Sequence, residues 1–227
     1  MSAALTALLV LALALVLGLV ALERGGGGAK ELALVATLGA VAAAGRVLFS
    51  PIPSVQPVTI ICLVTGASLG PRAGLAVGPI AGLISNSFLG QGPWTPAQMA
   101  LWSAAGLSGS VLRVVCRRAV GLAIVGALWG MLFGWAMNVW LLASFGPELS
   151  WASVILSCGR SLPFDLAHAT ANVVIALVAG PALVRLLGRY AARIRTEVVI
   201  LPVGPPAPGP APAGPAPPRP PAPARSR

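Results

Sequence analysis

Long apolar runs separated by short arginine-bearing stretches make up most of the chain. A helix that crosses the hydrocarbon core of a bilayer needs about 20 mostly apolar residues. Several segments approach this length: 2–22, 31–49, 54–70, 72–89, 96–112, 119–145 and 163–187. The pattern predicts an all-α integral membrane protein with about seven transmembrane helices. Segment 54–70 is the weakest of them because it is short, and a broken or partly re-entrant helix stays open there.

Composition changes along the chain in steps. Residues 1–30 hold the first apolar segment and its loop, residues 31–190 hold the other apolar segments, and residues 191–227 form a basic tail rich in proline and alanine. A secretory signal peptide carries positive charge before its apolar run, whereas Arg24 and Lys30 follow this one. We therefore expect a retained helix. The tail has almost no large apolar side chains to bury, so we expect it to be disordered.

Charged residues are few and unevenly placed. Only 9% of the 227 residues are charged and 57% are hydrophobic, against roughly 25% charged residues in soluble domains. The net charge of +10 comes from cations between apolar runs rather than on one basic face, so we expect no nucleic-acid partner. With the N-terminus outside and the C-terminus in the cytoplasm, all of the 15 Lys and Arg residues except Arg46 and Arg160 lie inside. The positive-inside rule thus predicts a multi-pass protein of the plasma membrane in this orientation.

Motifs for catalysis and for metal binding do not stand out. The three cysteines form no Cys-x-x-Cys pair and the only histidine is His168, so we predict no metal site and no cofactor. The chain has no Walker A, Gly-x-Ser-x-Gly or His-Glu-x-x-His motif, and we do not expect an enzyme. Any ATP-driven transport would therefore need a partner that hydrolyses the ATP.

Polar residues inside the predicted helices are the main functional clue, because such residues are costly in a bilayer unless they bind or pair. Asp165, His168 and Asn172 are spaced to share one face of the last segment, and in the predicted orientation they lie at its outer end. The other polar residues also fall in the outer half of the membrane, which predicts an outward-open pocket for a small organic molecule, partly walled by Trp135. The predicted substrate-binding residues are Arg46, Gln56, Asn86, Gln91, Trp94, Gln98, Trp102, Asn138, Asp165, His168 and Asn172.

Structural interpretations of the same residues stay open. Trp94 and Trp140 also suit an aromatic belt at the membrane interface. Arg46 also suits snorkelling to the interface or an ion pair with Asp165. The three prolines in residues 50–57 predict a stiff outer loop, which either caps the pocket or forms only a rigid turn.

Small residues repeat every four positions in several predicted helices, which lets another helix approach closely. The repeats are Ala36-Ala40-Ala44, Gly74-Gly78-Gly82 and Gly126-Gly130-Gly134. Packing within the bundle is the default interpretation of each repeat, and contact with a partner protein is the alternative for one of them.

Several motifs in residues 31–190 resemble, in order, the substrate-binding S components of energy-coupling factor (ECF) vitamin transporters. They are GRVLFSPIP at 45–53, QPVT at 56–59, GPRAG at 70–74, SNSFLGQGPWTP at 85–96, and DLAH at 165–168 followed by Asn172. The resemblance implies a six-helix core that captures a vitamin or related micronutrient on the outer side. It also implies delivery through a membrane coupling subunit and two cytoplasmic ATPases, with Ala36, Ala40 and Ala44 contacting the coupling subunit. The first helix and the tail are additional to the pattern.

Other functions stay open beside this one. A gradient-driven carrier working alone would use Asp165 and His168 to handle protons. An intramembrane enzyme would use the same two residues as orienter and base, although no convincing nucleophile lies beside them. A membrane scaffold is the plainest alternative. The resemblance suggests a corrinoid or a cobalamin precursor as substrate, but no residue singles it out.

Overall fold

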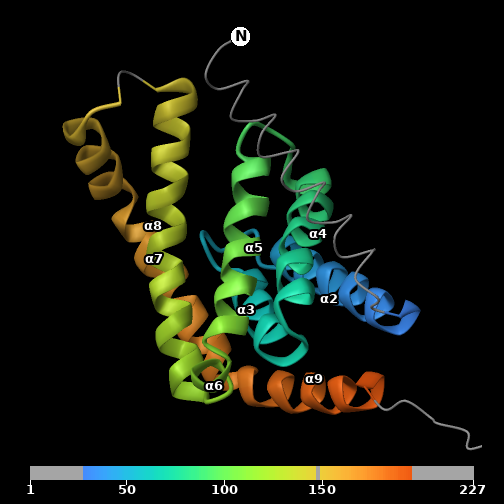
Figure 1. Ribbon diagram of the computed structural model, residues 1–227. Coiled ribbons are helices and arrows are strands. Elements are labelled where there is room, and N and C mark those ends of the chain that lie inside the picture. The colour runs from blue at the N-terminus through green and yellow to red at the C-terminus, as the bar shows by residue number, and fades with distance from the viewer. Residues whose placement is uncertain (1–27, 147–148, 196–227) are drawn as a thin grey trace, which may run out of the picture. The chain divides into compact units, whose positions relative to one another are not determined.

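The computed structural model describes residues 28–146 and 149–195, and every regular element in these ranges is an α-helix (Figure 1). The helices are α2 (Ala29–Leu48), α3 (Val58–Leu69), α4 (Pro71–Leu89), α5 (Thr95–Val111), α6 (Arg113–Cys116), α7 (Ala119–Phe145), α8 (Trp151–Val178) and α9 (Gly180–Arg195). The all-α prediction is thereby confirmed for the described part of the chain. The predicted first helix, 2–22, and the predicted tail from residue 196 onward lie outside the described residues.

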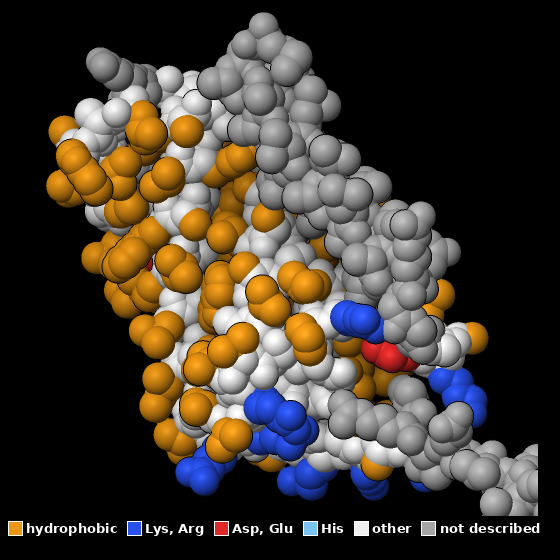
Figure 2. Space-filling model, in the orientation of Figure 1, with side chains coloured by type: hydrophobic (Ala, Val, Ile, Leu, Met, Phe, Trp, Pro, Cys, Tyr) orange, Lys and Arg blue, Asp and Glu red, His pale blue; other side chains and the backbone are white. Residues whose placement is uncertain are grey.

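Three of the described helices, α2, α7 and α8, are long and apolar enough to cross a membrane. Only 28%, 33% and 22% of their most apolar windows, respectively, are buried inside the protein. Figure 2 shows hydrophobic side chains spread over one side of the molecule, above a rim of Lys and Arg. Because exposed apolar faces of this extent need an apolar neighbour, the helices indicate a membrane protein. The count of seven spans stays a prediction.

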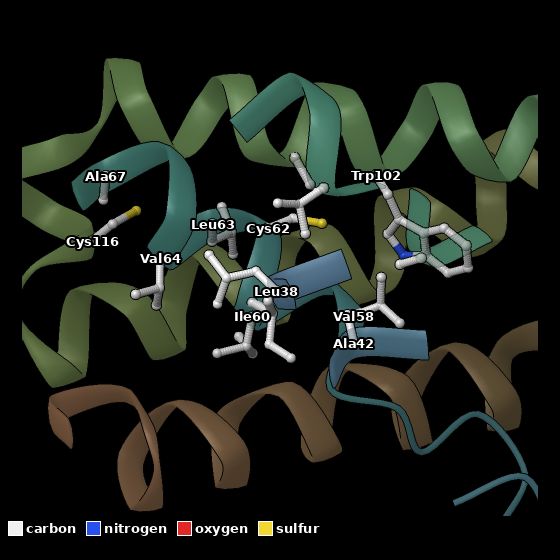
Figure 3. Close-up of a cluster of buried hydrophobic side chains, with 14 of the residues drawn as sticks. Leu38, Ala42, Val58, Ile60, Cys62, Leu63, Val64, Ala67, Trp102 and Cys116 are labelled. Carbon is white, nitrogen blue, oxygen red and sulfur yellow. The ribbon is translucent and has the colours of Figure 1, made fainter. Parts of the chain in front are cut away.

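Helix α3 is short and lies in the middle of the packing. Its 12 residues span roughly 18 Å at 1.5 Å per residue, and each one from Val58 to Ser68 is buried. It packs against α2, α4, α5, α7, α8 and α9, and its side chains fill the cluster shown in Figure 3. A helix that is covered on every side needs no polar face. The weakest predicted segment, 54–70, is therefore the core helix, and it begins only after the turn that ends at Pro57.

Glycines let α3, α4 and α5 approach until their backbones touch. A Cβ atom added to Gly66 in α3 would lie 1.8 Å from the carbonyl oxygen of Gly106 in α5. One added to Gly106 would lie 2.0 Å from the carbonyl oxygen of Gly74 in α4, and one added to Gly78 would lie 2.6 Å from the backbone of Trp102. The glycine repeat in α4 therefore packs within the bundle, which confirms the default interpretation of that repeat.

The last predicted segment, 163–187, is wrong in both its bounds and its continuity. Helix α8 starts at Trp151, where the Ser150 and Ser153 side chains form a reciprocal capping box, and Pro163 lies inside it. The helix ends at Val178, and α9 begins as a new helix at Gly180. Proline usually opens a helix, so the sequence favoured a start at Pro163. As a result, Asp165 lies near the middle of the 28-residue α8 rather than at an outer end.

Helix connectivity gathers most of the described arginines at one end of the bundle. The start of α4, the end of α5, all of α6, the start of α7 and the whole of α9 meet at this end (Figures 1 and 2). The exposed arginines there are Arg72, Arg113, Arg117, Arg118, Arg185, Arg189 and Arg193. Arg46 lies at the opposite end, in the last turn of α2. Helix α9 continues to Arg195, past the predicted start of the tail at residue 191. The cytoplasmic placement of the arginine-rich end stays a prediction.

Candidate functional site

Arg46 is held in place by neutral oxygen atoms from two neighbouring elements. Its Nε donates to Oε1 of Gln56, in the loop between α2 and α3, at 3.0 Å. Its Nη1 donates to Oγ of Ser85 at 2.7 Å and to Oδ1 of Asn86 at 2.5 Å, both in α4. Among the described residues, no carboxylate hydrogen-bonds to this guanidinium. The predicted alternative of an ion pair with Asp165 is therefore not formed.

A hydrogen-bond network continues from Asn86 to the start of α5. The Nδ2 group of Asn86 donates to Oγ1 of Thr95 and to Oε1 of Gln98, both at 2.9 Å. The Oγ1 hydroxyl of Thr95 donates to Oε1 of Gln91 at 2.9 Å. The predicted residues brought together in what we call the Arg46 network are Arg46, Gln56, Asn86, Gln91 and Gln98. Ser85 and Thr95 were not predicted as members of the site, because short hydroxyl residues in apolar helices usually bond only to their own backbone.

An aromatic series connects the Arg46 network to His168. The guanidinium carbon of Arg46 lies 5.1 Å from the ring centroid of Trp102, which is completely buried. Trp102 stacks on Phe133 of α7 with centroids 5.1 Å apart, and Phe133 meets the His168 ring edge-on at 5.5 Å. His168 Nε2 lies 3.2 Å from Oγ1 of Thr59 in α3. Phe133 and Thr59 were not predicted as members of the site, since neither residue type is unusual in an apolar helix.

The seam between α7 and α8 holds a separate polar group. Ser161 donates to Oδ2 of Asp165 at 2.7 Å, and Asn138 of α7 donates to the Ser161 oxygen, also at 2.7 Å. Asp165 is only 4% exposed. Further along α8, Nδ2 of Asn172 donates to the carbonyl oxygen of Gly126 at 2.9 Å. The predicted set therefore divides between the Arg46 network, the aromatic series and this seam.

The predicted confinement of polar residues to the outer half of the membrane is only partly correct. Arg46, Asn86 and Gln98 do lie at the end away from the arginine-rich end. His168 and Asn172 lie beyond the middle of α8, toward the arginine-rich end. The reason is the earlier start of α8, which moves its polar face inward by about three turns.

A pocket of about 250 Å³ opens beside Arg46. It is lined by Arg46, Ser50, Ile52, Ser54, Val55, Gln56 and Leu89. Most of these residues come from the proline-containing loop, in which Ser54 adopts a left-handed backbone conformation with φ of 61°. Such strained conformations cost energy and are concentrated at functional sites. The predicted tryptophan walls do not line this pocket, because Trp102 is buried beneath Arg46 and the partly exposed Trp94 and Trp135 lie elsewhere.

The alanine repeat in α2 faces outward, unlike the glycine repeats. Ala36, Ala40 and Ala44 are all exposed, whereas a Cβ atom on Gly130 of α7 would lie 2.6 Å from the backbone of Ala169 in α8. Beside the alanines lies an apolar hollow of about 400 Å³ between α2 and α4. It is lined by Ala40, Ala43, Ala44, Val47, Leu48, Ile84 and Phe88.

We expect Gly134→Ala to destabilise the protein, and to do so less once Asp165 is shortened. A Cβ atom on Gly134 would lie 1.8 Å from Oδ1 of Asp165, and overpacking of this kind typically costs about 1–3 kcal/mol. The apparent unfolding free energies of Gly134→Ala, Asp165→Ala and the double variant form a cycle that isolates this contact. Effects that add to within about 0.5 kcal/mol would show that the carboxylate does not occupy the space above Gly134.

These features define an all-helical membrane protein with a polar network and a pocket at the end of the bundle opposite its arginine-rich end. No protein-family model, no curated protein and no solved structure matches the chain. The class of the protein therefore follows from its own residues.

Proposed function

We propose that the chain is the substrate-specificity (S) component of an ECF-type importer, which captures a vitamin or related micronutrient on the outer face of the membrane. The observation that carries this proposal is the Arg46 network beside a pocket at the end opposite the arginine-rich end. Segments 45–53, 56–59 and 85–96, which carry the resemblance to S components, supply most of the residues of this network and pocket. Residues that are far apart in sequence thus serve one site.

Delivery in this proposal depends on partner proteins. The chain would dock on a membrane coupling subunit that is driven by two cytoplasmic ATPases. The exposed Ala36, Ala40 and Ala44 support this step, because small side chains permit the close approach of another helix within the bilayer. The neighbouring apolar hollow between α2 and α4 would give such a helix a matching surface.

The test begins with the full-length protein purified in detergent and analysed by native mass spectrometry. A small molecule bound at one copy per chain would identify the substrate. Uptake of that molecule is then measured in cells that express the chain with and without the partner ATPases. Uptake that is unchanged without the ATPases would contradict the proposal.

We expect Ala40→Phe to abolish uptake while leaving capture intact. The larger side chain would project from the exposed stripe and keep the coupling subunit at a distance, yet it lies outside the pocket beside Arg46. Ile124→Phe is the matched control, because Ile124 is 57% exposed on α7, away from the stripe. Normal uptake by Ala40→Phe would show that the alanine repeat in α2 is not part of the docking surface.

One observation favours a gradient-driven carrier as the second candidate. Asp165 is buried near the middle of α8, and among the described residues it accepts a hydrogen bond from the neutral Ser161. Ionisable groups at this depth commonly carry protons in transporters. For such a carrier, Asp165→Asn and an uncoupler would each stop uptake. For the proposed importer, uptake would survive both treatments as long as ATP is supplied.

A further inference from the structure

The Arg46 guanidinium has N–H donors that make no hydrogen bond to the described residues. An arginine side chain has five N–H donors in a fixed fork. Nε and Nη1 make the described bonds to Gln56, Ser85 and Asn86, whereas Nη2 makes none among the described residues. Nη2 is also absent from the buried polar atoms that lack a partner, so it is open to solvent or to a ligand. The three neutral acceptors hold the fork in one orientation while the two N–H donors of Nη2 stay available.

No carboxylate of residues 28–146 and 149–195 compensates the positive charge of Arg46. The carboxylates on described residues are Glu31, at the other end of α2, and Asp165, which is bound to Ser161 in the seam between α7 and α8. All the oxygen atoms that contact the guanidinium are neutral. A part-buried charge in an apolar bundle is costly unless something pairs with it, so the pocket is prepared for an anion.

The size and charge of the pocket limit which kind of molecule can carry the anion. Its volume of about 250 Å³ lies below the roughly 300–1,000 Å³ of sites that enclose drug-sized ligands. Arg46 is the only cation among the described residues that line the pocket, and one guanidinium matches one carboxylate in charge and in planar geometry.

We propose that this pocket binds the carboxylate of a small organic acid through Nη2 of Arg46. The inference rests on the proposed function, because it names the chemical class of the captured substrate. The serine hydroxyls of Ser50 and Ser54 line the same pocket and supply further donors. Ile52, Val55 and Leu89 give the apolar part of the acid a surface to contact.

The experiment compares sodium benzoate with benzamide, its neutral counterpart of similar shape. The full-length protein in detergent is titrated at neutral pH and constant ionic strength, and thermal unfolding is followed by tryptophan fluorescence. We expect benzoate to raise the unfolding midpoint and benzamide to leave it unchanged. Arg160→Gln is the matched control, because it removes an exposed cation from α8 and should keep the full response to benzoate.

Variants of the network show whether Arg46 is responsible. Arg46→Gln should weaken benzoate binding by about tenfold or more, as the loss of a charge-assisted hydrogen bond implies. Asn86→Asp should also weaken it, because the new carboxylate would stand where Oδ1 of Asn86 now accepts from Nη1. This second variant keeps the arginine and its packing, so it remains informative if Arg46→Gln unfolds.

Equal responses to benzoate and benzamide would overturn the inference, and so would a benzoate response that survives both variants. The outcome is separable from that of the proposed function. A response to benzoate without ATPase-dependent uptake would support the carboxylate site and contradict the importer function. If a micronutrient co-purifies and is imported but benzoate gives no response, the importer function would be supported and the carboxylate site contradicted.

Discussion

Gly106→Ala is expected to prevent the bundle from assembling. A Cβ atom at this position would lie 2.0 Å from the carbonyl oxygen of Gly74 and 2.5 Å from its carbonyl carbon. Both atoms belong to the backbone of α4, so no side-chain rotation relieves the contact. Helices α4 and α5 would have to separate, which would also open the contact of α5 with Gly66 in α3. Ordinary overpacking costs about 1–3 kcal/mol, and we expect a backbone-to-backbone clash to exceed that range.

The measurement is the yield of monodisperse protein together with its thermal unfolding midpoint in detergent. Gly188→Ala is the matched control, because a Cβ atom there would meet nothing within 4 Å and alanine favours helix more than glycine does. A midpoint for Gly106→Ala within about 2 °C of the parent protein would show that α4 and α5 are not in backbone contact.

Helix positions were predictable where turn residues mark the ends. Segment 119–145 matches α7, and 72–89 differs from α4 by one residue. Helix α4 is bounded by Gly70 and Gly90, whose positive φ angles of 104° and 105° suit glycine. The same logic failed at Pro163, because a proline within a long helix looks like a helix start. Only the capping box at Ser150 gave a competing signal, and it lacks the usual Glu or Gln.

Several residues of the candidate site could be predicted from the sequence, whereas the hydrogen bonds between them could not. Arg46, Asn86 and Asp165 stand out in sequence because a bilayer penalises unpaired polar groups. Their partners depend on which helix faces touch, and no local pattern encodes that. Arg46 therefore bonds to α4 and to the loop before α3, while Asp165 bonds within the seam of α7 and α8. Trp102 illustrates the same limit, because the sequence does not distinguish a tryptophan that lines a pocket from one that is buried beneath another side chain.

Arg46→Ala is expected to weaken capture of the natural substrate strongly under the proposed function. Charge-assisted hydrogen bonds contribute about 1.5–3 kcal/mol, and each 1.4 kcal/mol changes the dissociation constant about tenfold. The variant also removes the cation above Trp102 and leaves the oxygens of Gln56 and Asn86 without their donor. We therefore expect the affinity to fall by roughly tenfold to more than a hundredfold.

Two readouts separate lost binding from lost folding. Native mass spectrometry reports whether the co-purified molecule is retained, and the thermal midpoint without ligand reports the integrity of the bundle. Arg46→Lys restores the charge, but the three N–H donors of an ammonium group cannot replace the bonds to Gln56, Ser85 and Asn86 and also reach the anion. The variant should therefore recover folding more fully than binding. A loss of affinity below about twofold in Arg46→Ala would be smaller than any charge-assisted hydrogen bond. The guanidinium would then serve to hold α2 against α4 and the loop, and the substrate would have to bind elsewhere.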